Sequence, residues 1–162
     1  MERAQIVYDT LKQLDIAYSI VEHPPATSTE EADHYIEGKE GVRTKSLFLI
    51  NKKKTAFYLI IMDDQKRLDI KKLSSILDEK RLKFGSSELL LEKMNQSPGL
   101  VSPFGLWNNT EQDVQVYLDR EMLAEKVVTF HPDDNTKTIF FLTTDLYKLL
   151  DALGYPYTII DL

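Results

Sequence analysis

Two uninterrupted apolar runs, residues 47–50 and 56–62, restrict the fold of this chain more than any other feature. Short apolar runs bounded by polar residues are typical of strands that are covered on both faces. The polar segment 52–55 between the runs is short, so the two strands are expected to pair as a hairpin. The sequence therefore predicts a buried β-hairpin.

Shorter helix and strand patterns alternate along the rest of the chain. Strands are predicted over residues 16–21, 114–118, 124–130 and 138–142, and a Pro/Gly-rich loop over 97–109. Helices are predicted at five places: over 2–14 with Ile6, Val7, Leu11 and Leu14 on one stripe, from Ser28 to Ile36, after Asp69, after Ser86 or Ser87, and from Thr144 or Asp145 to Gly154. Hairpins mixed with short helices favour an α+β fold with a curved mixed, mainly antiparallel sheet surrounded by helices, because a parallel α/β fold needs longer crossover helices.

Composition is typical of a globular protein and excludes several classes of site. With 162 residues, 43% hydrophobic and 28% charged, the chain is expected to form a single domain over residues 1–162. No apolar segment is long enough to span a membrane, and the charged, helical start is unlike a secretory signal. The chain has no cysteine, which excludes disulfides and thiolate chemistry and fits a cytoplasmic protein.

Charge is distributed unevenly along the sequence. Residues 39–83 contain 13 Lys or Arg and 6 Asp or Glu, although the whole chain has a net charge of −6. A basic zone on an acidic protein suggests a localised contact with a polyanion, and Lys52, Lys53, Lys54, Lys71 and Lys72 would meet its phosphates if they lie beside the binding cleft. The alternative is a solvated charged face, which is the usual explanation of such runs.

Common catalytic motifs are absent from the sequence. No G-x-S-x-G elbow, P-loop or G-x-G-x-x-G occurs, and Ser102 lies in V-S-P-F-G, which is the wrong setting for a nucleophilic serine. The three histidines, His23, His34 and His131, show no ligand spacing, so no metal site is predicted.

Lys45 stands directly before the apolar run 47–50. Because side chains alternate between the two faces of a strand, Lys45 shares a face with Leu47 and Leu49. Its ammonium group is therefore a candidate to point into a cleft. A lysine at the frayed, solvated start of a strand is the alternative, because lysine is rarely buried without a partner.

Three proline-marked loops, at residues 22–27, 102–105 and 130–135, are further candidates for binding because each lies next to a predicted strand. For either histidine alone, His23 or His131, a turn residue is the favoured explanation, and Phe104 and Trp107 could be core residues.

Five motifs occur in order along the chain: H-P-P-x-x-S-x-E-E-A at 23–32, T-K-S-L-F-L at 44–49, V-S-P-F-G-L at 101–106, F-H-P-x-x-N-x-x-T at 130–138 and D-L-x-K-L-L-x-x-L-G-Y at 145–155. Together they resemble the YbaK/ProX-like aminoacyl-tRNA deacylases. The branch they resemble most is that of the free-standing prolyl-tRNA editing proteins, which are relatives of the insertion domain of bacterial prolyl-tRNA synthetases. The resemblance covers essentially the whole chain.

The resemblance implies hydrolysis of the ester between a wrong amino acid and the 3′ acceptor end of tRNA, with alanine on proline tRNA as the expected substrate. It implies no metal and no cofactor, because a tRNA hydroxyl is thought to help activate the attacking water. A synthetase or an elongation factor is left open as a further partner. A pocket built for proline rejects a smaller side chain by only ~1–3 kcal/mol, which is why a second, editing pocket is useful.

The resemblance also assigns roles to individual residues. Lys45 matches the central lysine of the family and is expected to bind the terminal phosphate or hold the ester near the attacking water. The other matched positions are expected to bind substrate: His23, Thr27, Thr44, Ser102, Pro103, Phe104, Gly105, His131 and Asn135. The sequence departs from the family pattern at Ser46, at Asn109 and at the acidic pair that follows Pro132.

Two other functions remain open from the sequence. The chain could bind aminoacyl-tRNA or another adenylated ligand without hydrolysis, or it could be a regulatory subunit that docks a partner through the basic zone. Ester turnover distinguishes the first from an enzyme, and dependence on tRNA distinguishes the second.

Overall fold

The computed structural model describes residues 3–26 and 28–162. Thr27, one of the predicted substrate-binding residues, lies outside the described residues. The elements in chain order are α1 (Arg3–Gln13), β1 (Tyr18–Glu22), α2 (Thr29–Tyr35), β2 (Val42–Asn51), β3 (Phe57–Asp63), α3 (Ile70–Leu77), β4 (Leu82–Phe84), α4 (Ser87–Met94), the 3₁₀ helix η1 (Pro103–Asn108), β5 (Val114–Asp119), α5 (Arg120–Leu123), β6 (Val127–Phe130), β7 (Lys137–Leu142), α6 (Thr143–Leu153) and β8 (Tyr157–Ile160).

The strands form one mixed sheet in the order β1-β7-β6-β2-β3-β5-β8, with β4 paired to β2 beside this path. The predicted hairpin is confirmed as the antiparallel pair β2–β3, in which Leu47 lies opposite Ile60. β1–β7, β6–β7 and β2–β4 are also antiparallel, whereas β2–β6, β3–β5 and β5–β8 are parallel. The prediction of an α+β fold with a mixed, mainly antiparallel sheet is confirmed.

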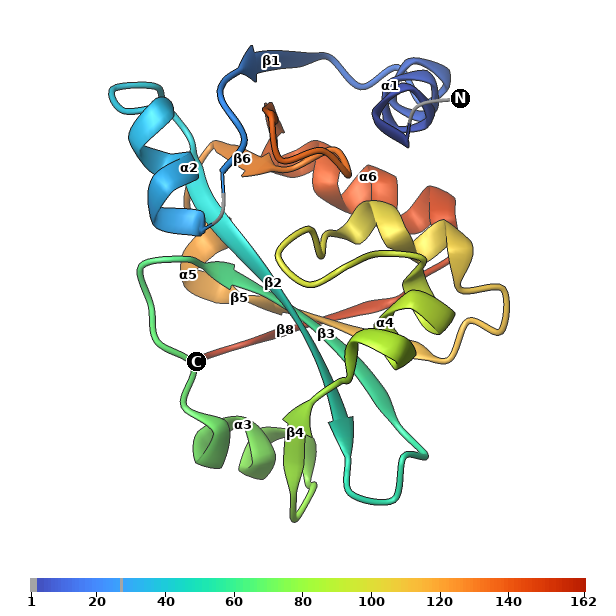
Figure 1. Ribbon diagram of the computed structural model, residues 1–162. Helices are drawn as coiled ribbons and strands as arrows, with labels where there is room; N and C mark the ends of the chain where they lie inside the picture. Colours follow the sequence, from blue (N-terminus) through green and yellow to red (C-terminus); the bar gives the residue numbers. More distant parts are fainter. Residues whose placement is uncertain (1–2, 27) are drawn as a thin grey trace.

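The long strand β2 connects the two halves of the sheet. Its first residues, Val42 and Arg43, pair with β6, and its last residues, from Leu49 to Asn51, pair with β4. β3 lies along the opposite edge of β2, so β6 and β4 border one edge at its two ends. Figure 1 shows α2 beside the start of β2, and β4 with α3 near its other end. The middle of this edge is left for a loop to cover.

Both faces of the hairpin are buried, as the unbroken apolar runs predict. Phe48 and Ile61 belong to the main hydrophobic core, which also contains α1, η1 and α6 side chains. Leu49 and Ile60 point to the opposite face, where they join a smaller cluster with Leu73 of α3. Because successive residues enter different cores, no polar residue alternates with the apolar ones.

Side-chain caps set the starts of three helices as predicted. The side chains of Ser28, Asp69 and Ser86 accept hydrogen bonds from the backbone N–H groups three residues ahead, at Glu31, Lys72 and Leu89. At the other end of the chain, Gly154 ends α6 in the left-handed conformation with φ of 83°.

Other local predictions are wrong. The last helix begins at Thr143, and Leu142 precedes it without a side-chain cap, so neither Thr144 nor Asp145 is the cap. The segment 97–109 is not entirely a loop, since it contains η1. On α1, Ile6 is exposed rather than part of the buried stripe. The short strands β4 and β8 and the helix α5 were not expected, and the predicted strand 124–130 begins only at Val127, because residues 124–126 form the turn after α5.

A cluster of charged groups fixes the end of α2 to the sheet. The guanidinium group of Arg43 donates hydrogen bonds to the carbonyls of Ile36 and Lys39, both at 2.8 Å. Asp33 of α2 lies beside Asp64, and one carboxylate oxygen of each is buried with no donor group from the described residues. Burial raises the pKa of Asp33 well above its ordinary value, and the neighbouring Asp64 carboxyl raises it further.

This pair predicts a pH-dependent stability. A raised pKa in the folded state contributes stability that is complete below the ordinary aspartate pKa of about 4 and is lost as pH rises through the folded-state value. Asp33→Asn cannot ionise, so we expect it to melt a few degrees higher than the wild type at pH 8. The difference should shrink towards pH 4. Thermal melting across this range tests the prediction, with the exposed Asp78→Asn as control; a variant no more stable at pH 8 would contradict it.

Candidate functional site

A small pocket of about 200 Å³ opens along the uncovered edge of β2, between its pairings with β6 and β4. Its walls come from the first half of β2, the loop before η1 and the junction after β6. The residues that line it are Thr44, Lys45, Ser46, Leu47, Gly99, Val101, Phe130 and His131. The structure therefore brings together three segments that the motifs single out, although they are far apart in sequence.

Lys45 contributes the positive charge of this pocket. Its ammonium group is partly buried and donates a hydrogen bond to the backbone carbonyl of Lys66. Among the residues that the structure describes, no carboxylate lies within 4 Å of it. The nearby Asp119 and Glu121 pair instead with the ammonium of Lys66, at 2.9 and 2.7 Å. The charge of Lys45 is therefore left uncompensated beside the pocket.

His131 presents a neutral imidazole to the same pocket. Its Nδ1 lies 3.0 Å from the carbonyl of Lys137, and a carbonyl can only accept, so Nδ1 carries the proton. The other ring nitrogen, Nε2, is then an acceptor. Burial lowers the pKa of His131, with the neighbouring His23 as a smaller cause acting in the same direction. The ring is therefore uncharged near neutral pH.

His23 lies behind His131 and does not line the pocket. The two rings meet edge to face at 6.3 Å, and the other side of His23 stacks on Tyr35 at 5.3 Å. Its Nδ1 donates to the carbonyl of Pro24 and its Nε2 lies 2.9 Å from the hydroxyl of the buried Thr138. The structure thus places His23 where it supports the His131 ring.

Thr44 and Asn135 connect the segments around the pocket. The Thr44 hydroxyl donates to the carbonyl of Thr129 and so ties β2 to β6. The Asn135 side chain donates to the carbonyl of Ala26 at 3.2 Å, and the Ala26 N–H donates to the Asn135 carbonyl at 3.0 Å. Asn135 therefore joins the loop after β6 to the loop before α2, and only Thr44 of these two lines the pocket.

The S-P-F-G segment forms a layer behind the pocket. Ser102 caps the start of η1, and all four residues from Ser102 to Gly105 are buried. Phe104 packs edge to face on Phe130, whose ring contributes to the pocket wall, with 6.1 Å between centroids. The segment shapes the wall, whereas Gly99 and Val101, just before it, form the surface of the pocket.

Gln96 holds two of the pocket loops together and was not expected from the sequence. Its amide nitrogen donates to the hydroxyl of Ser102 at 3.1 Å and to the carboxylate of Asp133 at 2.7 Å. Its amide oxygen accepts from the Ser102 N–H at 3.1 Å. A Cβ at Gly105 would lie 2.5 Å from the Gln96 amide, so only glycine allows this approach. In sequence, nothing distinguishes Gln96 from a solvated loop residue.

Ser46 is a second polar group that the sequence did not identify as part of the pocket. Its hydroxyl oxygen is buried and has no hydrogen-bond partner in the part of the chain that the structure describes. Because it belongs to the pocket lining, a polar group of a bound ligand could satisfy it.

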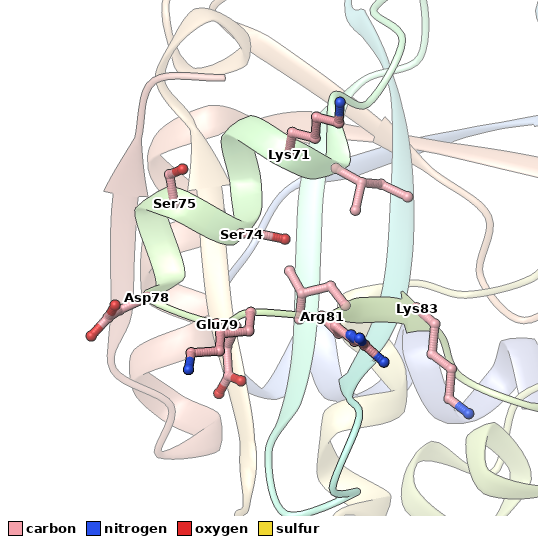
Figure 2. Close-up of a pocket in the computed structure, with 10 residues that line it drawn as sticks. Lys71, Ser74, Ser75, Asp78, Glu79, Arg81 and Lys83 are labelled. Carbon is pink, nitrogen blue, oxygen red and sulfur yellow. The ribbon is translucent and has the colours of Figure 1, made fainter.

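A larger, shallow hollow of about 730 Å³ lies between α3 and β4, at the other end of β2 (Figure 2). Within residues 3–26 and 28–162, no three His, Asp or Glu side chains come together as a metal site would require. Over the same residues, the helices are too short and too polar to cross a membrane.

The sequence matches the model of a known protein family and is similar to individual proteins with related names. The family model described as an aminoacyl-tRNA editing domain matches residues 23–149. The prolyl-tRNA editing protein ProX of Acetoanaerobium sticklandii is 32% identical over 163 residues, which cover 100% of this chain and 99% of that protein. The prolyl-tRNA synthetase associated domain-containing protein 1 of Danio rerio is 34% identical over 153 residues, covering 93% and 83%.

The fold is also similar to that of a solved structure. A crystal structure of a proposed trans-editing enzyme for prolyl tRNA synthetase superposes with a TM-score of 0.76 at 23% identity. The match covers 99% of this chain and 96% of that chain.

Proposed function

Because this chain belongs to the aminoacyl-tRNA editing domain family, we propose that it hydrolyses the ester bond of mischarged tRNA. The observation that carries this proposal is the uncompensated ammonium of Lys45 at a pocket of about 200 Å³. A binding module would use the same charge to hold the terminal phosphate, so measured turnover of the ester decides between the two functions. We further propose that residues 1–162 act as one editing domain.

The most fitting substrate is alanine esterified to proline tRNA. The relative from Acetoanaerobium sticklandii is named for prolyl-tRNA editing, which supports proline tRNA as the carrier. The pocket is smaller than the ~300–1,000 Å³ typical of drug-sized ligands, so it suits a small side chain. A second pocket that admits alanine and excludes proline can remove the error that a proline-sized pocket cannot reject strongly.

The residues around the pocket have distinct chemical roles in this proposal. Attack of water on the ester places negative charge on the carbonyl oxygen, and the Lys45 ammonium can stabilise that charge or bind the terminal phosphate. The neutral His131 forms part of the wall and offers Nε2 as an acceptor. Neither residue needs to form a covalent intermediate, and a hydroxyl of the tRNA ribose is proposed to help orient the water.

A deacylation panel tests the proposal. Proline tRNA charged with alanine, serine, cysteine or proline, and alanine tRNA charged with alanine, are incubated with the purified protein. We expect rapid release of alanine from proline tRNA and little release of proline, because we propose that the pocket selects against the larger ring. Inertness towards every mischarged tRNA would contradict hydrolysis and favour the binding module.

The same panel tests whether a partner protein assists the reaction. Adding prolyl-tRNA synthetase or an elongation factor shows whether either protein raises turnover by delivering the substrate. Mischarged tRNA arises where synthetases work, so we propose that the protein acts in the cytoplasm.

A further inference from the structure

Eight basic side chains gather at the end of β2 far from the pocket. They come from the turn between β2 and β3, from α3 and from the segment around β4, and the backbone N–H of Lys52 binds the carbonyl of Arg81 at 3.1 Å. We call this set the distal basic surface. It consists of Lys52, Lys53, Lys54, Lys71, Lys72, Lys80, Arg81 and Lys83.

Among the described residues, no ion pair involves the distal basic surface, although Glu88 and Glu92 line a neighbouring hollow with Lys54 and Lys83. All eight side chains are exposed, and within the part of the chain that the structure describes none has a carboxylate within 4 Å. By contrast, Lys66, Lys93 and Lys137 elsewhere each contact a carboxylate at 3.0 Å or less. Eight unpaired cations on a chain of net charge −6 repel one another, and an external polyanion relieves this repulsion.

The hollow between α3 and β4 concentrates this charge. Figure 2 shows Lys71 on one side of it and Arg81 and Lys83 on the other. Two carboxylates also line the hollow, but Asp78 points away at the end of α3 and Glu79 accepts a hydrogen bond from Tyr58 at 2.9 Å. The hollow is wide and shallow, a shape that suits contact with the phosphate backbone of a nucleic acid.

The position of this surface relative to the pocket suggests what binds there. Lys83 of β4 pairs with Ile50, on the same edge of β2 that the pocket borders nearer its start. At about 3.3 Å per residue, the six residues from Lys45 to Asn51 span roughly 20 Å. The lysines therefore do not lie beside the pocket, which was the condition that the sequence analysis set for them. They lie roughly 20 Å from it, at the other end of β2.

We propose that the distal basic surface binds the phosphate backbone of the duplex stem of the tRNA whose esterified 3′ end enters the pocket. This inference rests on the proposed function. A single-stranded 3′ tail bridges the separation along one edge of β2, and the stem then meets the cations. Lysine and arginine contacts to phosphate position the nucleic acid without reading its sequence, so the amino acid is still selected at the pocket.

A charge-matched pair of variants tests this surface. One variant carries Lys71→Gln, Arg81→Gln and Lys83→Gln. The control carries Lys12→Gln, Lys126→Gln and Lys148→Gln, which are exposed on other elements and change the net charge equally. Both are compared with the wild type in binding of uncharged proline tRNA across salt concentrations, and in hydrolysis of alanyl-tRNA and of an alanyl oligonucleotide that has only the 3′ tail.

We expect the first variant to bind tRNA at least roughly tenfold more weakly at low salt, and three lost phosphate contacts at about 0.9 each would flatten the slope of log affinity against log salt by roughly 2.7. Its KM for alanyl-tRNA should rise, while turnover of the stemless substrate stays unchanged. The control should resemble the wild type in every measurement.

Equal tRNA binding by the two variants would overturn the inference, as would a loss of binding to anionic vesicles or acidic peptides without a loss of tRNA binding. If the wild type hydrolyses no mischarged tRNA, the proposed function fails. The salt dependence of binding to uncharged tRNA still decides the inference about the surface in that case.

Discussion

Replacing Lys45 with alanine is expected to lower kcat/KM for hydrolysis of alanyl-tRNA(Pro) by at least about a hundred-fold, the effect typical of removing one preorganised group that stabilises developing charge. The reason lies in the surroundings of the ammonium group. Its protein partner is the carbonyl of Lys66, which does not neutralise it, whereas Asp119 and Glu121 pair with Lys66 instead. The full charge of Lys45 is thus available to the substrate.

The fold should survive this change. Lys45 is partly buried near the start of β2 rather than in the middle of the core, and its side chain makes one hydrogen bond to the protein. The melting temperature is therefore expected to fall by only a few degrees, and single-turnover hydrolysis gives the rate. Lys126→Ala, on the surface away from the pocket, controls for the loss of one positive charge.

Lys45→Arg separates geometry from charge. A guanidinium group keeps the charge but is planar and larger than an ammonium, so it cannot occupy the same position in a small pocket. We expect it to fail nearly as severely as alanine. Near-normal turnover of the arginine variant would refute the proposed placement, and near-normal turnover of the alanine variant would remove Lys45 from the mechanism.

The parts of the fold that could be predicted are those decided by neighbouring residues. The hairpin follows from two apolar runs and a short turn, and the caps at Ser28, Asp69 and Ser86 follow from side chains that bond to N–H groups three residues ahead. The predicted start of α6 was wrong because no side-chain cap marks the true start of this helix. β8 was missed because it has only 4 residues, too few for a strand pattern to stand out after the helix-ending Gly154 and Pro156.

The candidate site shows the same division. Motifs singled out Lys45 and His131, and the structure brings both to one pocket. The same motifs also emphasised Phe104, which lies in the layer behind the pocket. Gly99 and Gln96 were missed, because their roles arise only from how the loop before η1 packs against β2 and the segment after β6. A sequence pattern records which residues belong to a site, but not their distance from the ligand.

The second large effect is expected at Gln96. Its side chain is 1% exposed and makes three hydrogen bonds, two to Ser102 and one to Asp133. Gln96→Leu has a similar size but leaves the Ser102 N–H and the Asp133 carboxylate without this partner. Each buried group that loses its partner costs ~1–3 kcal/mol, and Asp133 costs less because it is only partly buried, so we expect a loss of roughly 2–4 kcal/mol in the free energy of unfolding.

For a chain of this length, a loss of that size corresponds to a melting temperature roughly 4–16 °C lower. Turnover should fall as well, even where the variant is folded, because Gln96 joins the loop that carries Gly99 to the loop that follows His131. Thermal melting and urea unfolding give the stability, and hydrolysis is measured well below the melting temperature of the variant.

Asp133→Asn is the matched control, because asparagine keeps an oxygen that can accept from Gln96. Residue 133 has a φ of 56°, a left-handed conformation that asparagine tolerates better than most residues. Burial already raises the pKa of Asp133, so the loss of its charge should cost little stability or even increase it. If Asp133→Asn destabilises the protein as much as Gln96→Leu does, the charge of Asp133 rather than the bridging amide holds these loops, and the proposed role of Gln96 is wrong.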